Sequence, residues 1–236
     1  MSQNLKGIIY YTDNKLGDPI YSLVQKHLLA SGLPIISSSL APIDFGENEV
    51  VAGPRGYPTM VKQIISCLER STARYVFFCE HDVLYHITHF DFTPPEEDIF
   101  YYNDSVWRWK LGSNTAIRHD RMLPLSSLCV NRKFALHHYE SRLKFIVGRG
   151  YDRKIEGDPA WMRKMGFEPG TKKRKRGGFS DDDFGTWSSE GFNIDIRHKK
   201  AFSPIKIRLQ DFTHKPKWWE EMPIKDVKDW NLEDLS

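Results

Sequence analysis

Hydrophobic and polar positions alternate along the first ninety residues in a pattern that predicts strands and helices in turn. Apolar runs at 7–11, 33–37 and 75–79 have the length and the flanking turn residues of strands. Between them, residues 18–29 and 58–68 carry the apolar spacing of amphipathic helices, each opened by a proline. This order predicts an α/β sheet with right-handed crossovers.

Polar clusters follow two of these predicted strands. Tyr11-Thr12-Asp13 ends the first strand, and Glu80-His81-Asp82 follows the uninterrupted apolar run 75–79, which is typical of a central strand buried on both faces. Ligands of such sheets bind at the carboxyl ends of the strands, so we expect both clusters at one binding edge.

The rest of the chain is less regular. Further strands are predicted at 99–102, 125–130 and 192–198, and a short helix begins at Asp158-Pro159. Residues 132–147 predict an amphipathic helix that buries Phe134, Leu136, Tyr139, Leu143 and Ile146. Residues 168–188 are rich in Gly, Lys, Arg, Ser and Asp and read as a loop.

Composition favours one globular domain. The chain has 236 residues, 40% of them hydrophobic and 28% charged, which suits a folded protein and excludes wholesale disorder. Three scattered cysteines, Cys67, Cys79 and Cys129, predict buried thiols in a reducing compartment. No apolar run is long enough to span a bilayer, and the start lacks the layout of a signal peptide, so we expect a cytoplasmic protein.

The formal net charge of +3 arises from one basic block, 172–176. Without its five positive residues, 29 basic residues face 31 acidic ones. A near-neutral body argues against a nucleic-acid-binding module, and we expect no nucleic acid among the partners. The block either contacts an anionic acceptor, such as a lipid diphosphate at a membrane surface, or belongs to a solvated loop.

Glu80-His81-Asp82 carries the strongest chemical signal. If the strand alternation continues, Glu80 and Asp82 point to the same side and offer oxygen ligands to a hard divalent ion. Alternatively, this is a strand end whose acids meet solvent or an arginine. A zinc cluster of Asp82 with His81, His86 and His89 is less favoured, because the last two precede Pro94-Pro95 in a predicted surface loop.

The region from Arg55 to His89 resembles the donor-site half of GT-A glycosyltransferases, with their DxD-type motif written Glu-His-Asp. Residues 193–198, ending in His198, match the later part of that pattern, and the resemblance covers roughly residues 5–205. It implies a GT-A (Rossmann-like) mixed sheet flanked by helices in a single domain. The catalytic domain would be 1–205, with a donor half at about 1–90 and an acceptor half at 91–205, followed by a tail at 206–236.

The resemblance also implies roles for individual residues. Asp82 and His198 would bind Mn²⁺ or Mg²⁺, with Glu80 as an accessory that contacts the ribose or a metal-bound water and His81 as a bystander in the donor site. Tyr11, Thr12 and Asp13 would hold the nucleotide base, and Arg55 and Gly56 a phosphate or a uracil carbonyl.

An inverting transfer needs a general base, which the family places at the start of a later acidic helix. Glu156 and Asp158 are the candidates, although Asp158 is also a natural N-cap before Pro159, and Glu190 is third. The loop 170–188 would be a lid or simply a solvated loop. Trp107 and Trp109 would either stack on an acceptor sugar or lie in the core.

Together these features predict an inverting glycosyltransferase that moves a sugar from a nucleoside diphosphate-sugar, UDP- or GDP-linked, to a hydroxyl of a glycan or lipid-linked acceptor. A metal-dependent nucleotide-sugar phosphohydrolase is the main alternative, and a nucleic-acid-binding module the weaker one.

Overall fold

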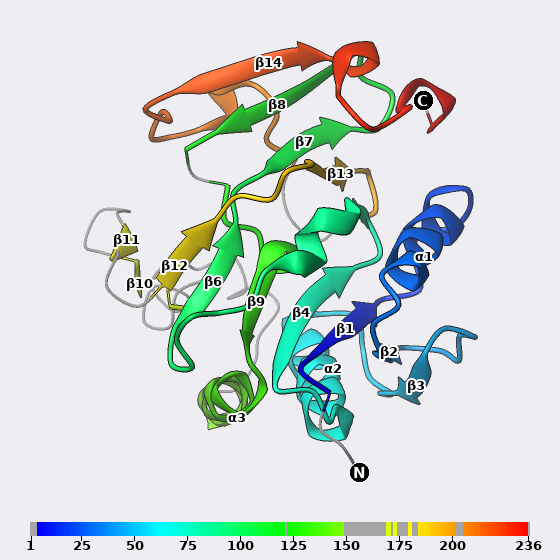
Figure 1. Ribbon diagram of the computed structural model, residues 1–236, viewed down its shortest axis with the longest axis vertical. Helices are drawn as coiled ribbons and strands as arrows, with labels where there is room; N and C mark the ends of the chain where they lie inside the picture. The colour runs from blue at the N-terminus through cyan, green and yellow to red at the C-terminus, as the bar shows by residue number, and fades with distance from the viewer. Residues whose placement is uncertain are drawn as a thin grey trace.

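The computed structural model describes residues 4–120, 122–148, 169–170, 172–173, 179–180, 184–201 and 205–235. A seven-stranded sheet forms its centre (Figure 1). The strand order is β12 (Phe184–Trp187), β6 (Phe100–Asn103), β9 (Leu128–Asn131), β4 (Tyr75–Glu80), β1 (Lys6–Thr12), β2 (Ile35–Ser39) and β3 (Glu47–Val50). Strands β4, β1, β2 and β3 are parallel, whereas β9 runs antiparallel to β4 and β6. The predicted mixed α/β sheet is therefore confirmed.

Helices cover both faces of this sheet. Successive residues of its central strands point to opposite sides, and because these residues are apolar, both faces are buried. On one face, α1 (Ile20–Ala30) shares a core with Tyr10 and Phe77. On the other, α2 (Tyr57–Arg70) and α3 (Arg132–Gly148) cover Tyr11 and Phe78. Tyr75 to Cys79 are buried, as expected for a central strand.

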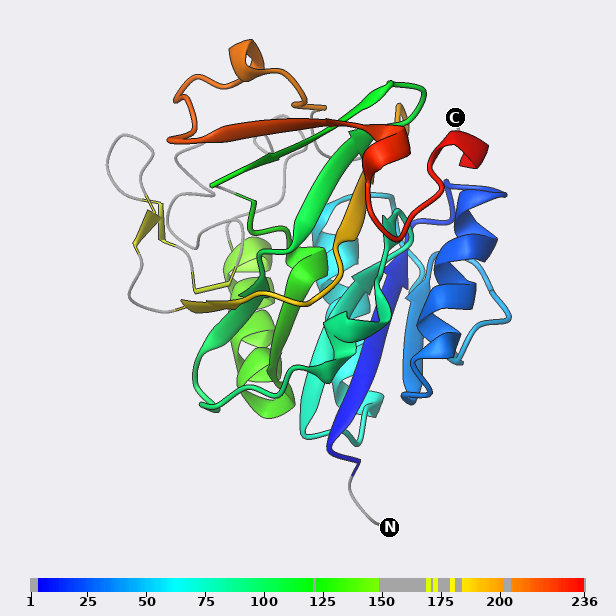
Figure 2. The same ribbon diagram turned by 45° about the horizontal axis from the view of Figure 1, so that its top comes forward.

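A five-stranded sheet lies beside the main one (Figure 2). Its order is β14 (Trp219–Pro223), β8 (Thr115–His119), β7 (Val106–Lys110), β13 (Asn193–Arg197) and β5 (Val83–Leu84). Its inner face joins the core on the α1 side through Trp107, Trp109, Ile194 and Ile196. The predicted tail supplies β14, which pairs with β8 along its whole length.

Shorter elements complete the described part of the chain. Strands β10 (Lys172–Lys173) and β11 (Phe179–Ser180) pair with each other. The 3-10 helices are η1 (Ile87–Asp91), η2 (Leu125–Ser127), η3 (Leu209–Asp211), η4 (Ile224–Asp226) and η5 (Glu233–Leu235). Among the described residues, no helix is both long and apolar enough to cross a bilayer.

Several local predictions were wrong. No strand was predicted between 37 and 58, where the edge strand β3 lies, and the predicted loop 168–188 contains β12, which pairs with β6. Helix α3 buries Ala135, Tyr139, Arg142 and Ile146, while Phe134, Leu136 and Leu143 are only partly buried. The buried side is rotated because Arg142 turns inward, where its guanidinium donates to the hydroxyl of Tyr57.

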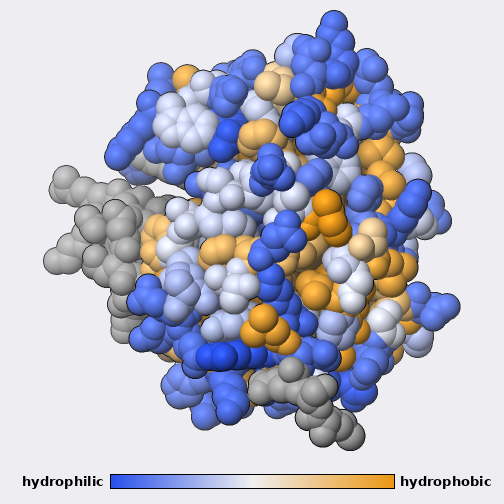
Figure 3. Space-filling view, in the orientation of Figure 1, coloured by the Kyte–Doolittle hydropathy of each residue, from blue (hydrophilic) through white to orange (hydrophobic). Residues whose placement is uncertain are grey.

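The surface shown in Figure 3 is mostly polar, and its apolar side chains gather on the side where α1 lies. The exposed Leu29 of α1 belongs to that side of the molecule. The three cysteines are buried and free, as predicted. Burial raises the pKa of each thiol, so none has the character of a reactive thiolate.

Candidate metal centre at the strand ends

Three chain segments meet at one edge of the main sheet. Strands β1 and β4 are parallel with Tyr11 opposite Glu80, so the residues that follow each strand emerge side by side. Strand β13 is brought to the same place by its antiparallel pairing with β5 and by a 2.9 Å hydrogen bond from the Ile196 amide to the Asp82 carbonyl. The two clusters predicted at strand ends and His198 therefore lie together.

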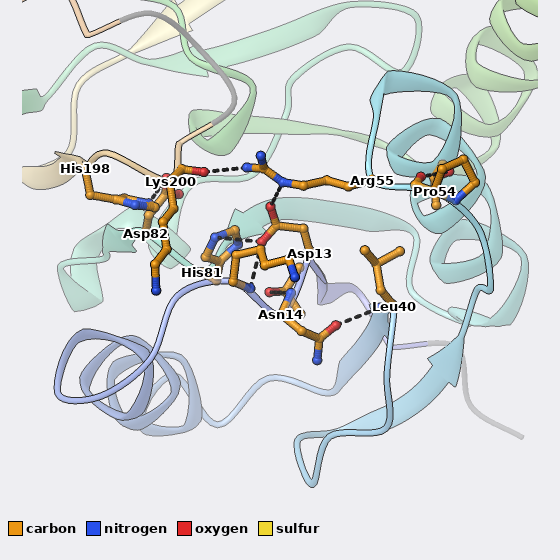
Figure 4. Close-up of polar contacts among 12 residues, drawn as sticks. Asp13, Asn14, Leu40, Pro54, Arg55, His81, Asp82, His198 and Lys200 are labelled. Atoms are coloured by element: carbon orange, nitrogen blue, oxygen red, sulfur yellow. Dashed lines mark hydrogen bonds and ion pairs between the residues drawn. The ribbon is translucent and has the colours of Figure 1, made fainter. Parts of the chain in front are cut away.

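His81, Asp82 and His198 form a group that could bind a metal ion. One potential ligand atom from each lies within 4.8 Å of the others. His198 Nε2 is 3.4 Å from Asp82 Oδ2 (Figure 4). Nδ1 of His81 and Nε2 of His198 are buried and make no hydrogen bond of normal geometry. Buried ring nitrogens without such partners, next to a buried carboxylate, fit a site for a divalent cation.

Electrostatics favour the ionised form of Asp82. Burial alone would raise the pKa of this carboxyl, but the contact with His198 and the nearby His81 outweigh it, so its pKa lies below the ordinary value. A carboxylate held in its charged form is the state required of a metal ligand.

Asp13 and Arg55 support this group from the side of β1. One carboxylate oxygen of Asp13, Oδ1, lies 3.6 Å from His81 Nε2, and the other accepts a hydrogen bond from Arg55 Nε (Figure 4). Arg55 Nη2 also donates to the carbonyl of Lys200, two residues after His198. The Asp13–Arg55 pair therefore bridges the ends of β1 and β13.

Glu80 lies outside the His81–Asp82–His198 group. It accepts a 2.6 Å hydrogen bond from the Tyr11 hydroxyl, and burial and the adjacent Asp82 raise the pKa of its carboxyl. The strand ends at Glu80, and His81 and Asp82 form a turn, so the strand alternation on which the predicted pairing of the two acids rested does not continue past Glu80.

A fixed positive charge lies behind the two acids. Arg197 is partly buried, with 14% of its side chain exposed, and its guanidinium is attracted to Asp82 and Glu80. It donates a 2.9 Å hydrogen bond to Oδ2 of Asp195, and Arg108 donates a 3.0 Å bond to the same oxygen. Two guanidinium groups thus share one buried carboxylate at the edge of the site. Sequence reasoning missed this trio, although period-two alternation in 193–197 places Asp195 and Arg197 on one face.

The other predicted residues have varied positions. Thr12 is buried, and its hydroxyl accepts a hydrogen bond from the Asn14 amide. Gly56 is the N-cap residue of α2, and Glu190 is exposed. Glu156 and Asp158, predicted as general-base candidates, lie outside the described residues. Trp107 and Trp109 are core residues and do not form an acceptor surface.

The prediction that His86 and His89 lie in a surface loop was wrong for His89. This residue is fully buried, and its Nδ1 lies 2.9 Å from Asn103 Nδ2 and 3.0 Å from Asn193 Nδ2. Burial lowers the pKa of His89 to about 3, so it is a neutral core histidine. Neither His86 nor His89 belongs to the candidate metal group, whereas His81, predicted as a bystander, does.

Comparisons with known proteins give distant structural resemblances. No protein-family model matches this chain, and no curated protein sequence does either. The bifunctional IspDF from Campylobacter jejuni aligns with a TM-score of 0.39 and 10% identity, over 79% of this chain and 49% of that chain. The apo-form glycosyltransferase GlyE in Streptococcus pneumoniae TIGR4 aligns with a TM-score of 0.41 and 12% identity, over 78% of this chain and 45% of that one. The chain therefore spans about half the length of these structures.

Proposed function

We propose that this chain is a metal-dependent transferase that moves a sugar from a nucleoside diphosphate-sugar to an acceptor hydroxyl. The observation that carries the proposal is the group His81, Asp82 and His198 at the carboxyl edge of a parallel β-sheet, where α/β proteins bind their ligands. The GT-A-type order of buried strand, acidic motif and late histidine supports the same reading.

The ion bound by these residues would supply Lewis-acid stabilisation of the departing diphosphate. The protein groups around it have their own tasks. Arg197 provides a positive charge beside the carboxylates, held in place by Asp195. Such preorganised charge stabilises the negative charge that develops on a leaving phosphate. Tyr11, Thr12 and Asp13, at the end of β1, would hold the nucleotide base, and Arg55 and Gly56, just before α2, would bind a phosphate or a uracil carbonyl.

For the acceptor step we retain Glu156 and Asp158 as the proposed general bases of an inverting mechanism. A base must take the proton of the acceptor hydroxyl as that oxygen attacks the anomeric carbon. The acceptor would be a glycan or a lipid-linked sugar, and transfer would take place in the cytoplasm.

A thermal-shift screen tests the donor site. Nucleoside diphosphates and their sugar conjugates, UDP- and GDP-linked among them, should raise the melting temperature in the presence of Mn²⁺ and much less in the presence of EDTA. Asp82→Ala should abolish the metal-dependent rise. Asp98→Ala, which removes an exposed carboxyl that does not belong to the metal-binding group, should leave it unchanged. A rise that persists in Asp82→Ala would contradict the donor-site assignment.

Product analysis then separates transfer from hydrolysis. Incubation with the stabilising donor and a panel of acceptors should attach the sugar to an acceptor, as detected by mass spectrometry. If free sugar or sugar phosphate forms with every acceptor, the chain is a nucleotide-sugar phosphohydrolase instead.

A further inference from the structure

His81 presents its two ring nitrogens to different surroundings. Nε2 faces the carboxylate of Asp13 at 3.6 Å, whereas Nδ1 is buried with no hydrogen-bond partner in the described part of the chain. A nitrogen that faces a carboxylate is the one that carries the proton, because a lone pair there would repel the negative oxygen. The neutral ring then has its free lone pair on Nδ1.

This arrangement resembles the way proteins prepare a metal-binding histidine. Histidine ligands usually donate their second ring N–H to a carboxylate, which fixes the tautomer and makes the ligating nitrogen more basic. The 3.6 Å separation of Nε2 and Oδ1 is an ion-pair contact, longer than the roughly 3.2 Å limit of a hydrogen bond.

Arg55 holds Asp13 in this position. Its Nε donates to Asp13 Oδ2, and its Nη2 donates to the carbonyl of Lys200. The other oxygen, Oδ1, accepts a 3.0 Å hydrogen bond from the Lys15 amide and also faces His81. Lys200 follows the second histidine of the group, His198, by two residues. The Asp13–Arg55 ion pair therefore contacts the segments that carry both histidines: Asp13 faces the His81 ring, and Arg55 binds the backbone that follows His198. Asp13 itself is not a member of the metal-binding group.

The donor set determines which ions the site favours. A site with one carboxylate and two imidazoles offers two nitrogen donors, which bind Fe²⁺ and Zn²⁺ strongly and Mn²⁺, the weakest of the divalent transition ions, less strongly. Mg²⁺ prefers an all-oxygen octahedral shell and loses water reluctantly. With His81 as a ligand, the site differs from an oxygen-rich acidic motif completed by a single histidine.

We propose that His81 is a metal ligand through Nδ1, that Asp13 is its positioning residue, and that the second imidazole makes the site select Mn²⁺ over Mg²⁺. The inference rests on the metal site of the proposed function, but it concerns the ion and its ligands alone. It can therefore be tested without a nucleotide or an acceptor.

Binding of the metal alone is the first measurement. Mn²⁺ and Mg²⁺ are titrated into the EDTA-treated full chain, with calorimetry for both ions and electron paramagnetic resonance for free Mn²⁺. The wild type should bind Mn²⁺ at least about tenfold more tightly than Mg²⁺. His81→Ala should lose most of this preference, because its remaining ligands are one carboxylate and one imidazole. Asp13→Ala should weaken Mn²⁺ binding by about 10- to 100-fold, the usual effect of removing a carboxylate that orients a ligand.

Conservative variants distinguish positioning from folding. Asp13→Asn keeps an oxygen that can accept from Nε2, so it should retain more Mn²⁺ affinity than Asp13→Ala while losing the ionic contact with Arg55. Electron spin echo measurements on bound Mn²⁺ should detect two coordinated imidazole nitrogens in the wild type and one in His81→Ala. Far-UV circular dichroism and melting temperature identify any variant that has unfolded.

The outcomes separate this inference from the proposed function. If the wild type shows one imidazole on Mn²⁺, or if His81→Ala keeps the wild-type preference, His81 is not a ligand. If Asp13→Ala binds Mn²⁺ like the wild type, Asp13 is not its positioning residue. If the metal results are as expected but no nucleotide binds, the proposed function fails while this inference holds.

Discussion

The hydroxyl of Tyr11 donates a 2.6 Å hydrogen bond to Oε1 of Glu80, its register partner on the neighbouring strand. Both residues belong to the side of the sheet that α2 and α3 cover, where Tyr11 is part of the core. Glu80 is thereby held by a neighbour within the sheet, apart from the turn that carries His81 and Asp82.

Replacing Tyr11 by Phe should lower the free energy of unfolding by about 1–3 kcal/mol, because it leaves a buried carboxyl without its donor. Tyr10→Phe is the matched control. The Tyr10 hydroxyl is buried with no hydrogen-bond partner of normal geometry among the described residues, so its removal should be neutral or stabilising. Urea unfolding of the two variants checks this, and equal losses would argue against a special role for the Tyr11–Glu80 bond.

Replacing Asp195 by Asn should cost about 3 kcal/mol, since two largely buried guanidinium groups, 13% and 14% exposed, lose the buried carboxylate that they share. Glu49→Gln breaks the 3.0 Å ion pair with Arg70, in which both side chains are more than 40% exposed, and should change stability by less than about 1 kcal/mol. Chemical denaturation of both variants measures the difference. Similar values would mean that Asp195 is well solvated.

A glycine series separates backbone strain from steric overlap. Gly46 has φ +60°, and a Cβ there would lie 2.5 Å from the carbonyl oxygen of Ile35, so Gly46→Ala should be the most destabilising. Gly32 has φ +67° with open space around it, so Gly32→Ala should cost only the conformational term of about 1–2 kcal/mol. At Gly17 the φ angle is not in the left-handed region and a Cβ would contact nothing within 4 Å, so Gly17→Ala should change stability least. Melting temperatures should fall in the order Gly17, Gly32, Gly46, and any other order would contradict this account.

Acid should destabilise the protein through His89. Its pKa falls from an ordinary 6.5 to about 3 on burial, so between these values the unfolded chain binds a proton that the folded chain does not. Burying the neutral His89 costs no stability above about pH 6.5. As the pH falls from 6.5 toward 3, the free energy of unfolding decreases by up to about 1.4 kcal/mol per pH unit. His89→Gln removes this term, although it also disturbs the contacts with Asn103 and Asn193.

The measurement is urea unfolding of the wild type and of His89→Gln at several pH values between 4 and 7. The variant should be less stable at pH 7 and should show the shallower dependence on pH. Parallel curves for the two proteins would mean that His89 is protonated in the folded state.

Sequence patterns predicted the main sheet well where burial leaves a simple periodicity. The apolar run 75–79 is one example, because a central strand is buried on both faces. The helix 58–68 is another, because it buries a single apolar stripe. The five-stranded sheet was largely missed, because its strands mix large aromatic and charged residues, as in Val106–Lys110, and pair with distant segments. Pairing between residues far apart in sequence leaves no local signal.

The candidate site was predicted in part for the same reason. Position at a strand end pointed to Asp82, and the resemblance to GT-A glycosyltransferases pointed to His198. The position of His81 depends on the turn that follows Glu80 and ends the strand alternation. The position of Arg197 depends on the carboxylate of Asp195, which it shares with Arg108 of the neighbouring strand. Such relationships arise from tertiary structure.

The pairing of β14 with β8 has a consequence for the order in which the protein is made. Strands β5, β7, β8, β13 and β14 span residues 83 to 223, so the five-stranded sheet cannot be completed until residue 223 has left the ribosome. Strand β13, which carries Arg197 and leads to His198, docks between β5 and β7, which are made about 110 and about 90 residues earlier. During synthesis the parallel strands β1 to β4 can assemble first, and the candidate metal centre is among the last features to form.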